Sequence, residues 1–191
     1  MQHFGSDILT VADRLTDAYV EVFTAPPWDH RDPAATRKEF RQRLEVDAHR
    51  PGFRAALSLA ADGEVDGFVT GWVTQAPFPA DRAYGEVTRR LGADRVDALL
   101  VGAFEIDELG VRARTRGTGL GKQLLSALTA TAPAGRAWLL TWDQAHATLA
   151  FYRRMGWREP EPLPGRATGV VVFLSPFSGG DRGAAVTESG G

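Results

Sequence analysis

The chain has 191 residues, of which 22 are basic and 24 acidic, so its formal net charge is −2. This length predicts one domain with a hydrophobic core of its own, or one domain with a tail. Hydrophobic residues make up 43% and charged residues 24%, which is typical of a globular protein and excludes a disordered chain. The near-neutral charge lacks the basic excess of a nucleic-acid-binding protein, so we expect no nucleic-acid partner.

Missing residue types and segments restrict the chemistry further. The chain contains no cysteine, which excludes disulfides, thiolate metal sites and a cysteine nucleophile. The four histidines have no metal-ligand spacing, so we expect no metal. No run approaches 18 apolar residues and no signal peptide is recognisable at the start, so we expect a cytoplasmic protein with no membrane partner.

Two helices and a hairpin are predicted in the first part of the chain. Apolar residues recur at spacings of three and four after Ser6, which we expect to cap the first helix. Asp32 followed by Pro33 is typical of the start of a second helix, whose basic residues, Arg43 among them, should face outward or toward a partner. Asp62 and Gly63 between two apolar runs predict a β-hairpin. The expected elements are helices over 7–23 and 33–47 and strands over 53–61 and 65–74.

The second half alternates strands and helices, which predicts an α/β sheet with helices packed on it. Residues 75–100 have the weakest pattern. The final 17 residues contain five glycines and three serines, so we expect one domain over 1–174 and a flexible tail over 175–191. The expected elements are helices over 84–91, 93–100, 119–131 and 145–155 and strands over 103–111, 136–142 and 168–174.

A glycine-rich loop between a strand and a leucine-striped helix is the most informative segment. Glycines at 117, 119 and 121 let backbone amides approach an anion at the positive end of the helix. The spacing fits neither the dinucleotide pattern GxGxxG nor the triphosphate pattern GxxxxGK[ST]. The pattern that remains is Arg116-x-x-Gly119-x-Gly121. Residues 111–122 around it contain four basic residues and no acidic one, and this excess of positive charge predicts a local phosphate site. The basic residues are Arg112, Arg114, Arg116 and Lys122.

This loop resembles the R/Q-x-x-G-x-G/A motif of the GCN5-related N-acetyltransferase (GNAT) family. A second segment, FYRRMGW over 151–157, resembles the F-Y-x-x-x-G-F/W segment of that family, and the two occur in the family's order. The resemblance implies an α/β fold with a mixed, mostly antiparallel twisted sheet flanked by helices. It also implies that the sheet is splayed between the strand that ends at Val111 and the strand over 136–142.

The resemblance further implies direct transfer of an acetyl group from acetyl-CoA to a primary amine, without an acyl-enzyme. Tyr152 matches the tyrosine that protonates the departing thiolate, and Glu105 is the favoured base. Asp107 and Glu108 remain alternatives for the base. The implied cofactor-binding residues are Leu109, Gly110, Val111, Arg116, Gly117, Thr118, Gly119, Leu120, Gly121 and Lys122.

Strand geometry adds two expectations. In a regular strand, Glu105 and Asp107 share one face and Glu108 lies on the other. Gly110 is expected to mark a bulge that splays the strands and admits the pantetheine arm.

The sequence departs from the family pattern in two places. Ala145 and Thr148 stand where many family members have Asn and Ala, and residues 1–5 leave little room for the usual first strand.

The acceptor cannot be read from a motif. We expect its pocket between the first two helices, residues 75–100 and the segment before the last strand, with Trp28, Trp72 and Trp142 as candidate lining residues. A small-molecule amine, such as an antibiotic or a polyamine, is the leading hypothesis, and a protein N-terminus or lysine is the second. A non-catalytic acyl-CoA-binding module is the competing class, and a homodimer stays open.

Overall fold

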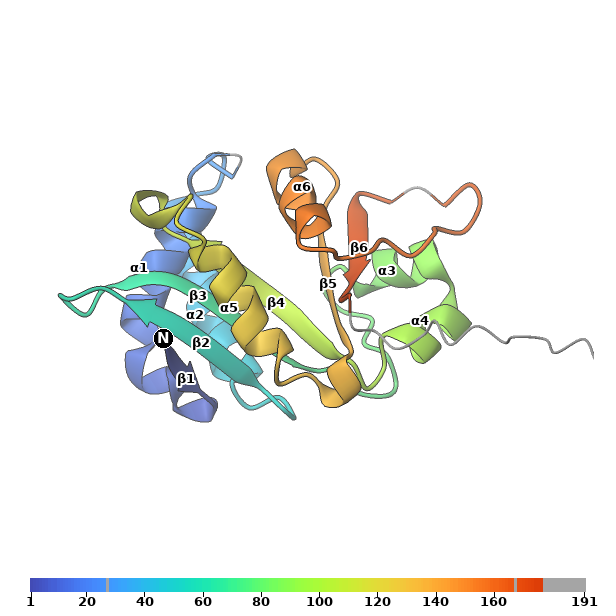
Figure 1. The fold of residues 1–191 in the computed structure, drawn as a ribbon, viewed down its shortest axis with the longest axis horizontal. Coiled ribbons are helices and arrows are strands. Elements are labelled where there is room, and N and C mark those ends of the chain that lie inside the picture. Colours follow the sequence, from blue (N-terminus) through green and yellow to red (C-terminus); the bar gives the residue numbers. More distant parts are fainter. Residues whose placement is uncertain (27, 167, 177–191) are drawn as a thin grey trace, which may run out of the picture.

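The computed structural model describes residues 1–26, 28–166 and 168–176, and its centre is one six-stranded sheet (Figure 1). The strand order follows the chain, and all neighbouring strands are antiparallel except β4 and β5, which are parallel. This is the mixed, mostly antiparallel sheet that the sequence predicts. The strands are β1 (Gln2–Phe4), β2 (Arg54–Leu59), β3 (Val65–Val73), β4 (Phe104–Val111), β5 (Ala137–Trp142) and β6 (Val170–Leu174).

Helices cover both faces of β2, β3 and β4. Helices α1 and α2 pack on one face, and α5, which connects the parallel pair β4 and β5, packs on the other. Asp32 caps α2 by accepting a 2.7 Å hydrogen bond from the amide of Ala35, which confirms the predicted helix start. The bounds are α1 (Ala12–Phe23), α2 (Pro33–Asp47) and α5 (Leu120–Thr129).

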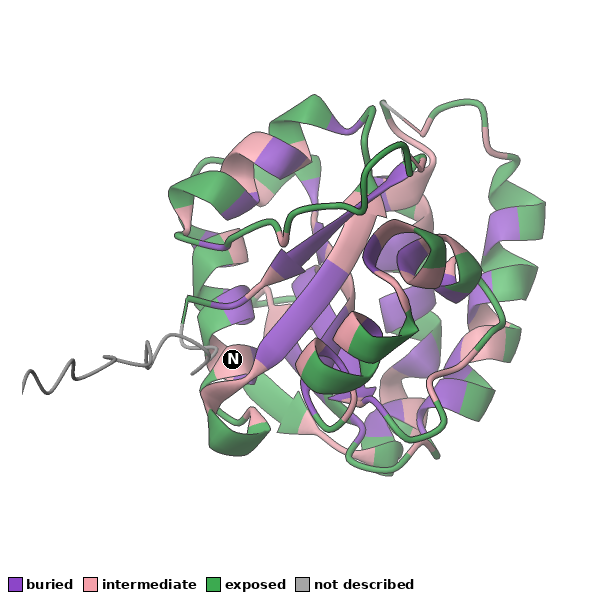
Figure 2. Cartoon of the chain, turned by 90° about the vertical axis from the view of Figure 1, so that its right-hand side faces the viewer, coloured by how far each residue is buried: buried purple, intermediate pink, exposed green. Residues whose placement is uncertain are grey.

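The last two strands carry helices on both faces as well. Trp138 and Val172 point into the core under α3 and α4, whereas Leu139 and Phe173 point toward α6, as strand alternation requires. Figure 2 shows these strands largely buried between helices whose outward sides are exposed. The bounds are α3 (Tyr84–Leu91), α4 (Ala93–Leu99) and α6 (His146–Arg154).

Strands β4 and β5 lie together at one end and diverge at the other. Their paired register begins at Phe104 with Ala137 and ends at Ile106 with Leu139. Beyond this point the two strands separate, as Figure 1 shows. The splay that the sequence predicts is therefore confirmed, and it exposes the later half of β4, which carries the candidate site residues.

A β-bulge interrupts β4 at Asp107 and not at Gly110. Thr70 of β3 pairs with Glu108, but the next residue, Gly71, pairs with Ile106, so Asp107 is the inserted residue. Gly110 pairs regularly with Phe68. The predicted bulge position is therefore wrong by three residues, because pairing with β3 and not local glycine content decides where the strand distorts.

Gly71 lies opposite the bulge and allows the two backbones to come close. A Cβ atom placed on Gly71 would lie 2.1 Å from the carbonyl oxygen of Glu105 and 2.6 Å from the ring of Phe104. Only a residue without a side chain fits there without a shift of β4.

Two local predictions near the ends of the described chain need correction. Residues Ser6–Val11 form a 3₁₀ helix and α1 starts only at Ala12, so Ser6 does not cap an α-helix. Ser175, predicted as the start of a flexible tail, is buried, and its amide donates a 2.8 Å hydrogen bond to the carbonyl of Ala137. The rest of the predicted tail, 177–191, lies outside the described residues.

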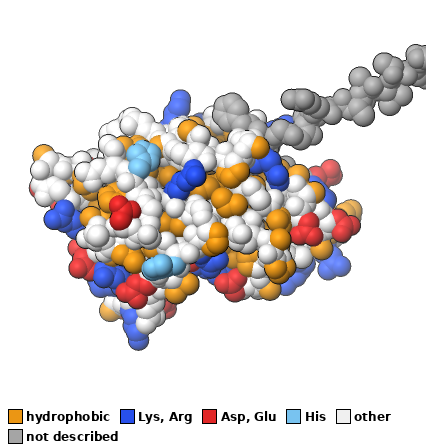
Figure 3. Space-filling model, turned by 90° about the horizontal axis from the view of Figure 1, so that it is seen from below, with side chains coloured by type: hydrophobic (Ala, Val, Ile, Leu, Met, Phe, Trp, Pro, Cys, Tyr) orange, Lys and Arg blue, Asp and Glu red, His pale blue; other side chains and the backbone are white. Residues whose placement is uncertain are grey.

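The outer surface mixes charges of both signs. Basic and acidic side chains are interspersed on the face shown in Figure 3. In the described ranges of the chain, no helix combines the length and apolar character needed to cross a membrane.

Candidate active site

A cavity of about 990 Å³ lies where β4 and β5 separate. Its walls come from both halves of the chain: α1, the α1–α2 connection and α2, the start of α3, strands β4 and β5, the loop before α5, and α6. The sheet therefore brings the glycine-rich loop, the acidic segment of β4 and the aromatic segment of α6 to one space.

The glycine-rich loop has the geometry of an anion cradle. Gly117 and Gly119 adopt left-handed backbone conformations with φ of 79° and 86°, and Gly119 is the residue directly before α5. The amides of Leu120, Gly121 and Lys122 belong to the first helical turn, where backbone donors have no intrahelical acceptor. Residues from this loop and helix start line the cavity, so a phosphate group fits here.

Eight of the ten predicted cofactor residues line the cavity. The two exceptions are Gly110, which lies against the ring of Phe68, and Thr118, whose hydroxyl donates a 2.8 Å hydrogen bond to the carbonyl of Thr115. The eight residues are Leu109, Val111, Arg116, Gly117, Gly119, Leu120, Gly121 and Lys122.

Only two of the four basic residues near the loop face the cavity. Arg112 is buried and pairs with Glu21 and Glu64 at 3.0 and 3.2 Å, and Arg114 pairs with Asp66 at 2.7 Å. Arg116 and Lys122 line the cavity and form no ion pair with a described residue. The expectation of a four-cation phosphate site is therefore wrong, because two of the cations neutralise carboxylates of neighbouring elements.

The later half of β4 offers backbone donors to the cavity. The amide of Arg112 donates a 2.9 Å hydrogen bond to the carbonyl of Asp66 on the β3 side. Because amides alternate in direction along a strand, the amide of Gly110 also points to β3, and those of Leu109 and Val111 point into the splay. The two flanking residues, and not Gly110, are thus placed to bind a ligand through their amides.

Tyr152 of α6 has its ring in the core and reaches the cavity. It is 6% exposed, its ring packs against Phe151, Trp157 and Phe173, and it lines the cavity. Burial, with a further contribution from the negative charge of Glu108, raises its pKa above that of a free tyrosine. Its hydroxyl therefore keeps its proton and is available as a donor.

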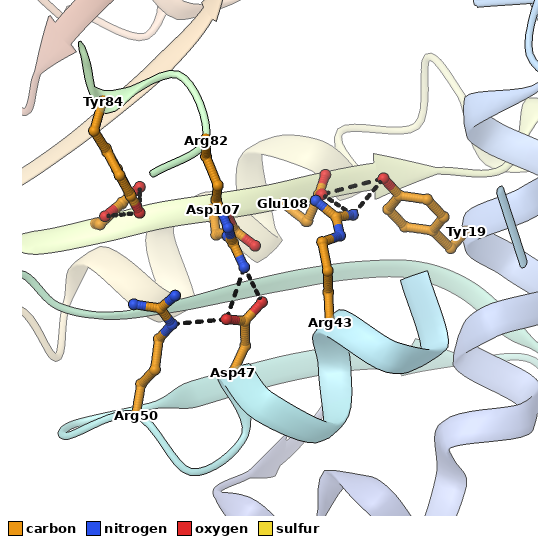
Figure 4. Close-up of polar contacts among 9 residues, drawn as sticks. Tyr19, Arg43, Asp47, Arg50, Arg82, Tyr84, Asp107 and Glu108 are labelled. Atoms are coloured by element: carbon orange, nitrogen blue, oxygen red, sulfur yellow. Dashed lines mark hydrogen bonds and ion pairs between the residues drawn. The ribbon is translucent and has the colours of Figure 1, made fainter. Parts of the chain in front are cut away.

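Three carboxylates of β4 face the same side of the sheet and line the cavity. Glu105 contacts Tyr84, Asp107 contacts Arg82, and Glu108 contacts Arg43 and Tyr19, all from helices or loops on the α1–α2 side of β4 (Figure 4). The expectation that Glu108 lies on the opposite face is wrong, because the bulge at Asp107 reverses the alternation after it.

Glu105 is the most enclosed of the three carboxylates. It is 3% exposed, and both of its carboxylate oxygens accept hydrogen bonds from the hydroxyl of Tyr84, at 2.9 and 3.0 Å. Burial is the main cause that raises the pKa of Glu105 to about 8; the charge of Asp107 adds to it, and the hydrogen bond from Tyr84 opposes it. A carboxyl group with this pKa can take up and release a proton near neutral to mildly alkaline pH, as a general base for an amine must.

Asp107 and Glu108 are held by arginines. Arg82 binds Asp107 at 3.0 Å and also Asp47 of α2 at 2.6 Å, and its own backbone is left-handed, with φ of 53°. Burial raises the pKa of Asp107, as does the charge of Glu108, and Arg82 counteracts this. Arg43 lies 3.0 Å from Glu108 and 2.9 Å from the hydroxyl of Tyr19. Both carboxylates thus already have a cationic partner.

Sequence similarity and this geometry agree. A family model described as an acetyltransferase (GNAT) domain matches residues 59–159, more than half of the chain. The chain belongs to the GNAT family. It is therefore an acetyltransferase, and acetyl-CoA is the acetyl donor. No curated protein matches its sequence significantly.

Solved GNAT structures share the fold at low sequence identity. An acetyltransferase from Thermus thermophilus is 18% identical, with a TM-score of 0.56 over 92% of this chain and 97% of that one. The PaiA N-acetyltransferase of Thermoplasma acidophilum, solved with coenzyme A, is 13% identical, with a TM-score of 0.56 over 92% and 99%. NAA60 of Arabidopsis thaliana, solved with a bisubstrate analogue, is 17% identical, with a TM-score of 0.52 over 86% and 91%.

Sequence reasoning missed the residues that surround the β4 carboxylates of this GNAT protein. Tyr84, Arg82 and Arg43 come from segments without a motif, and only the placement of Arg43 on the outward or partner-facing side of its helix hinted at a role. Of the tryptophans, Trp28 and Trp142 line the cavity, but Trp72 is 2% exposed in the core. Among the described residues, no three histidine or carboxylate side chains are grouped to hold a metal ion.

Proposed function

We propose that this protein transfers the acetyl group of acetyl-CoA directly to the primary amine of a small molecule. The observation that carries this proposal is one cavity lined by the anion cradle at Gly119, the hydroxyl-bearing Tyr152 and the buried carboxylate of Glu105. Its volume of about 990 Å³ is at the upper end of the range for a single small-molecule site, and acetyl-CoA must share it with the acceptor, which favours a small acceptor.

Acetyl-CoA supplies the acetyl group as a thioester. The amides at the start of α5, with Arg116 and Lys122, hold its pyrophosphate, and the amides of Leu109 and Val111 align its arm along β4. The segment of α6 that carries Tyr152 closes the other side of the splay.

The proton transfers are assigned to two side chains. Glu105 accepts a proton from the ammonium of the acceptor, directly or through water, so that the nitrogen lone pair is free to attack. The carbon–nitrogen bond forms, the carbon–sulfur bond breaks, and Tyr152 donates its proton to the leaving sulfur. The second proton lost by the nitrogen restores Tyr152, and the products are an acetamide, the thiol of coenzyme A and one proton.

A thiol-release assay with a panel of acceptors tests the proposal. The panel contains small primary amines, peptides with free N-termini and peptides with internal lysines. Thiol release with small amines is the expected result, whereas release with peptides alone would favour the second hypothesis, a protein acetyltransferase. Binding of acetyl-CoA without turnover of any amine would instead support a non-catalytic acyl-CoA-binding module.

Tyr152→Phe separates a catalytic tyrosine from a packing one. The change keeps the ring and its contacts and removes only the hydroxyl, so turnover should fall about 10²–10⁴-fold. Calorimetric titration with acetyl-CoA should show nearly unchanged affinity. A variant that turns over at the wild-type rate would show that the hydroxyl donates no proton in the slow step.

A further inference from the structure

We call the part of the cavity that is lined by α1, the α1–α2 connection, α2, the start of α3, the end of β5 and the carboxylates of β4 the acceptor end. Four carboxylates line it, and three of them have a cationic partner within the protein. Asp107 pairs with Arg82 and Glu108 with Arg43, both at 3.0 Å. Glu86, at the start of α3, pairs with Arg89 at 2.7 Å. Each of these three carboxylates therefore already has a cationic partner, although the pair of Glu86 and Arg89 is partly exposed.

Glu105 is the exception. It is 3% exposed, and among the described residues only the neutral hydroxyl of Tyr84 contacts its carboxylate; no arginine, lysine or histidine lies within ion-pair distance. A buried carboxylate without a cation is costly to charge, and burial accordingly raises its pKa. A cation that enters with the substrate would supply the missing charge.

A second cation would find no such partner. Arg43, Arg82 and Arg31 all line this end of the cavity. Arg31 lies over the ring of Trp28, with its guanidinium carbon 5.1 Å from the ring centroid, and forms no ion pair with a described residue. A second ammonium on the acceptor would therefore face guanidinium groups instead of free carboxylates, which disfavours it.

The remaining wall of this end is apolar. It consists of aliphatic and aromatic side chains from α1, the α1–α2 connection and the end of β5. Such a wall buries hydrocarbon or a ring and offers few hydrogen-bond partners to a polyhydroxylated acceptor. The residues are Val22, Phe23, Pro26, Trp28 and Trp142.

We infer that the acceptor is a monoamine, with one cationic nitrogen that binds at Glu105 and an apolar or aromatic remainder. This inference rests on the proposed function, and it argues against the polyamine of the initial hypothesis. The cavity selects by charge: one ammonium is paired, and any further cation is repelled.

Matched pairs of amines test the inference in the thiol-release assay. Hexylamine and 1,6-diaminohexane share the same chain and differ in one terminal ammonium. The value of kcat/KM should be at least about tenfold higher for the monoamine, a difference of about 1.4 kcal/mol. Phenethylamine should be accepted, and spermidine should be a poor acceptor.

Arg43→Gln should weaken the preference for monoamines. The change leaves Glu108 without its cation, so the cavity gains a second free carboxylate and the ratio of diamine to monoamine kcat/KM should rise at least about tenfold. Arg43→Lys should restore a ratio close to that of the wild type. In the double variant Arg43→Gln/Glu108→Gln the gain should disappear.

Arg41→Gln is the matched control on the same helix, because Arg41 pairs with Asp13 outside the cavity. It should leave the ratio unchanged. A wild-type preference for diamines, or an unchanged ratio in folded Arg43→Gln, overturns the inference and leaves amine acetylation standing. Absence of turnover with every amine, while acetyl-CoA still binds, overturns the proposed function itself and this inference with it.

Discussion

Tyr84 shows how one side chain from a segment without a motif completes the candidate site. Its hydroxyl donates to both oxygens of Glu105, and both residues are buried. Because a hydrogen bond to the charged form stabilises it, Tyr84 holds the pKa of Glu105 below the value that burial alone would give. We regard Tyr84 as a positioning residue that acts through Glu105.

Tyr84→Phe should shift the pH profile and not simply lower the rate. Without the hydroxyl the anion of Glu105 loses a hydrogen bond of about 1.5–3 kcal/mol, so its pKa rises by about one to two units. Since Glu105 must be deprotonated to act as a base, the rising acid limb of the kcat/KM profile moves to higher pH. Activity should be lost near neutral pH and largely recovered in alkaline buffer.

Tyr19→Phe serves as the comparison, because it makes the same change on the same cavity wall but next to Glu108. Even if Tyr19→Phe changes KM, the midpoint of the acid limb of its kcat/KM pH profile should stay at the wild-type pH. An identical shift in both variants would show that Glu105 is not the group that titrates. The charges of Asp107, Arg82 and Arg50, which also act on Glu105, are the same in both variants.

At the scale of elements, the junction of the loop and α5 is the feature that we propose to bind the pyrophosphate of the donor. Gly119→Glu places a side chain and a negative charge beside the amides that would hold the pyrophosphate. Acetyl-CoA affinity should fall by more than about tenfold in calorimetric titration, whereas the fold, followed by circular dichroism, should remain. Retained affinity in a folded variant would rule out this loop as the phosphate site.

Gly119→Ala controls for backbone strain, since any residue with a Cβ is disfavoured at φ of 86° and the space around Gly119 is open. It shares the strain of Gly119→Glu but adds no charge. The difference in affinity between the two variants therefore measures the effect of the charged side chain apart from that of backbone strain.

The bulge in β4 depends on a glycine of the neighbouring strand. In Gly71→Ala the added Cβ would meet the backbone of Glu105 at 2.1 Å, so β4 must shift, and we expect a loss of about 1–3 kcal/mol in the free energy of unfolding. Chemical denaturation checks this value. Gly85→Ala in α3, where nothing lies within 4 Å, should be neutral or stabilising by up to about 1 kcal/mol. Equal effects of the two changes would refute the close approach.

For the molecule as a whole, the near-zero net charge conceals a local positive potential. The net charge is −2, yet Arg116, Lys122 and Arg154 line the cavity without an ion pair to a described residue. These cations should therefore attract the anionic acetyl-CoA. Salt should weaken this attraction, since the screening length is about 10 Å at 0.1 M and about 3 Å at 1 M.

Acetyl-CoA affinity should accordingly weaken about three- to tenfold when NaCl is raised from about 0.05 to about 0.5 M, as the screening length shortens. Lys122→Gln should flatten this dependence. Arg114→Gln should not, because Arg114 is paired with Asp66 outside the cavity. A salt-independent affinity, or tight binding of DNA at physiological salt, would contradict the assignment of these cations to the donor.

Local patterns in the sequence determined most elements and the family, and they located the loop that we propose as the donor site. Asp32 with Pro33, the Asp62-Gly63 turn and the loop at Gly119 each encode their structure within a few residues, because capping, turns and left-handed backbone are local properties. Leu109, Val111 and Tyr152 could be located in advance because their two segments resemble motifs of the GNAT family, and all three line the cavity.

Only the tertiary structure decided which charges remain free at the acceptor end. Whether a basic residue faces a ligand depends on carboxylates distant in the sequence: Glu21 and Asp66 remove Arg112 and Arg114 from the donor side, and Arg82 and Arg43 neutralise two carboxylates of β4. The face of Glu108 depends likewise on a bulge set by pairing with β3. Ion pairs and strand register join residues that lie far apart in the chain, so no local pattern records them, and they leave Glu105 as the carboxylate without a cation.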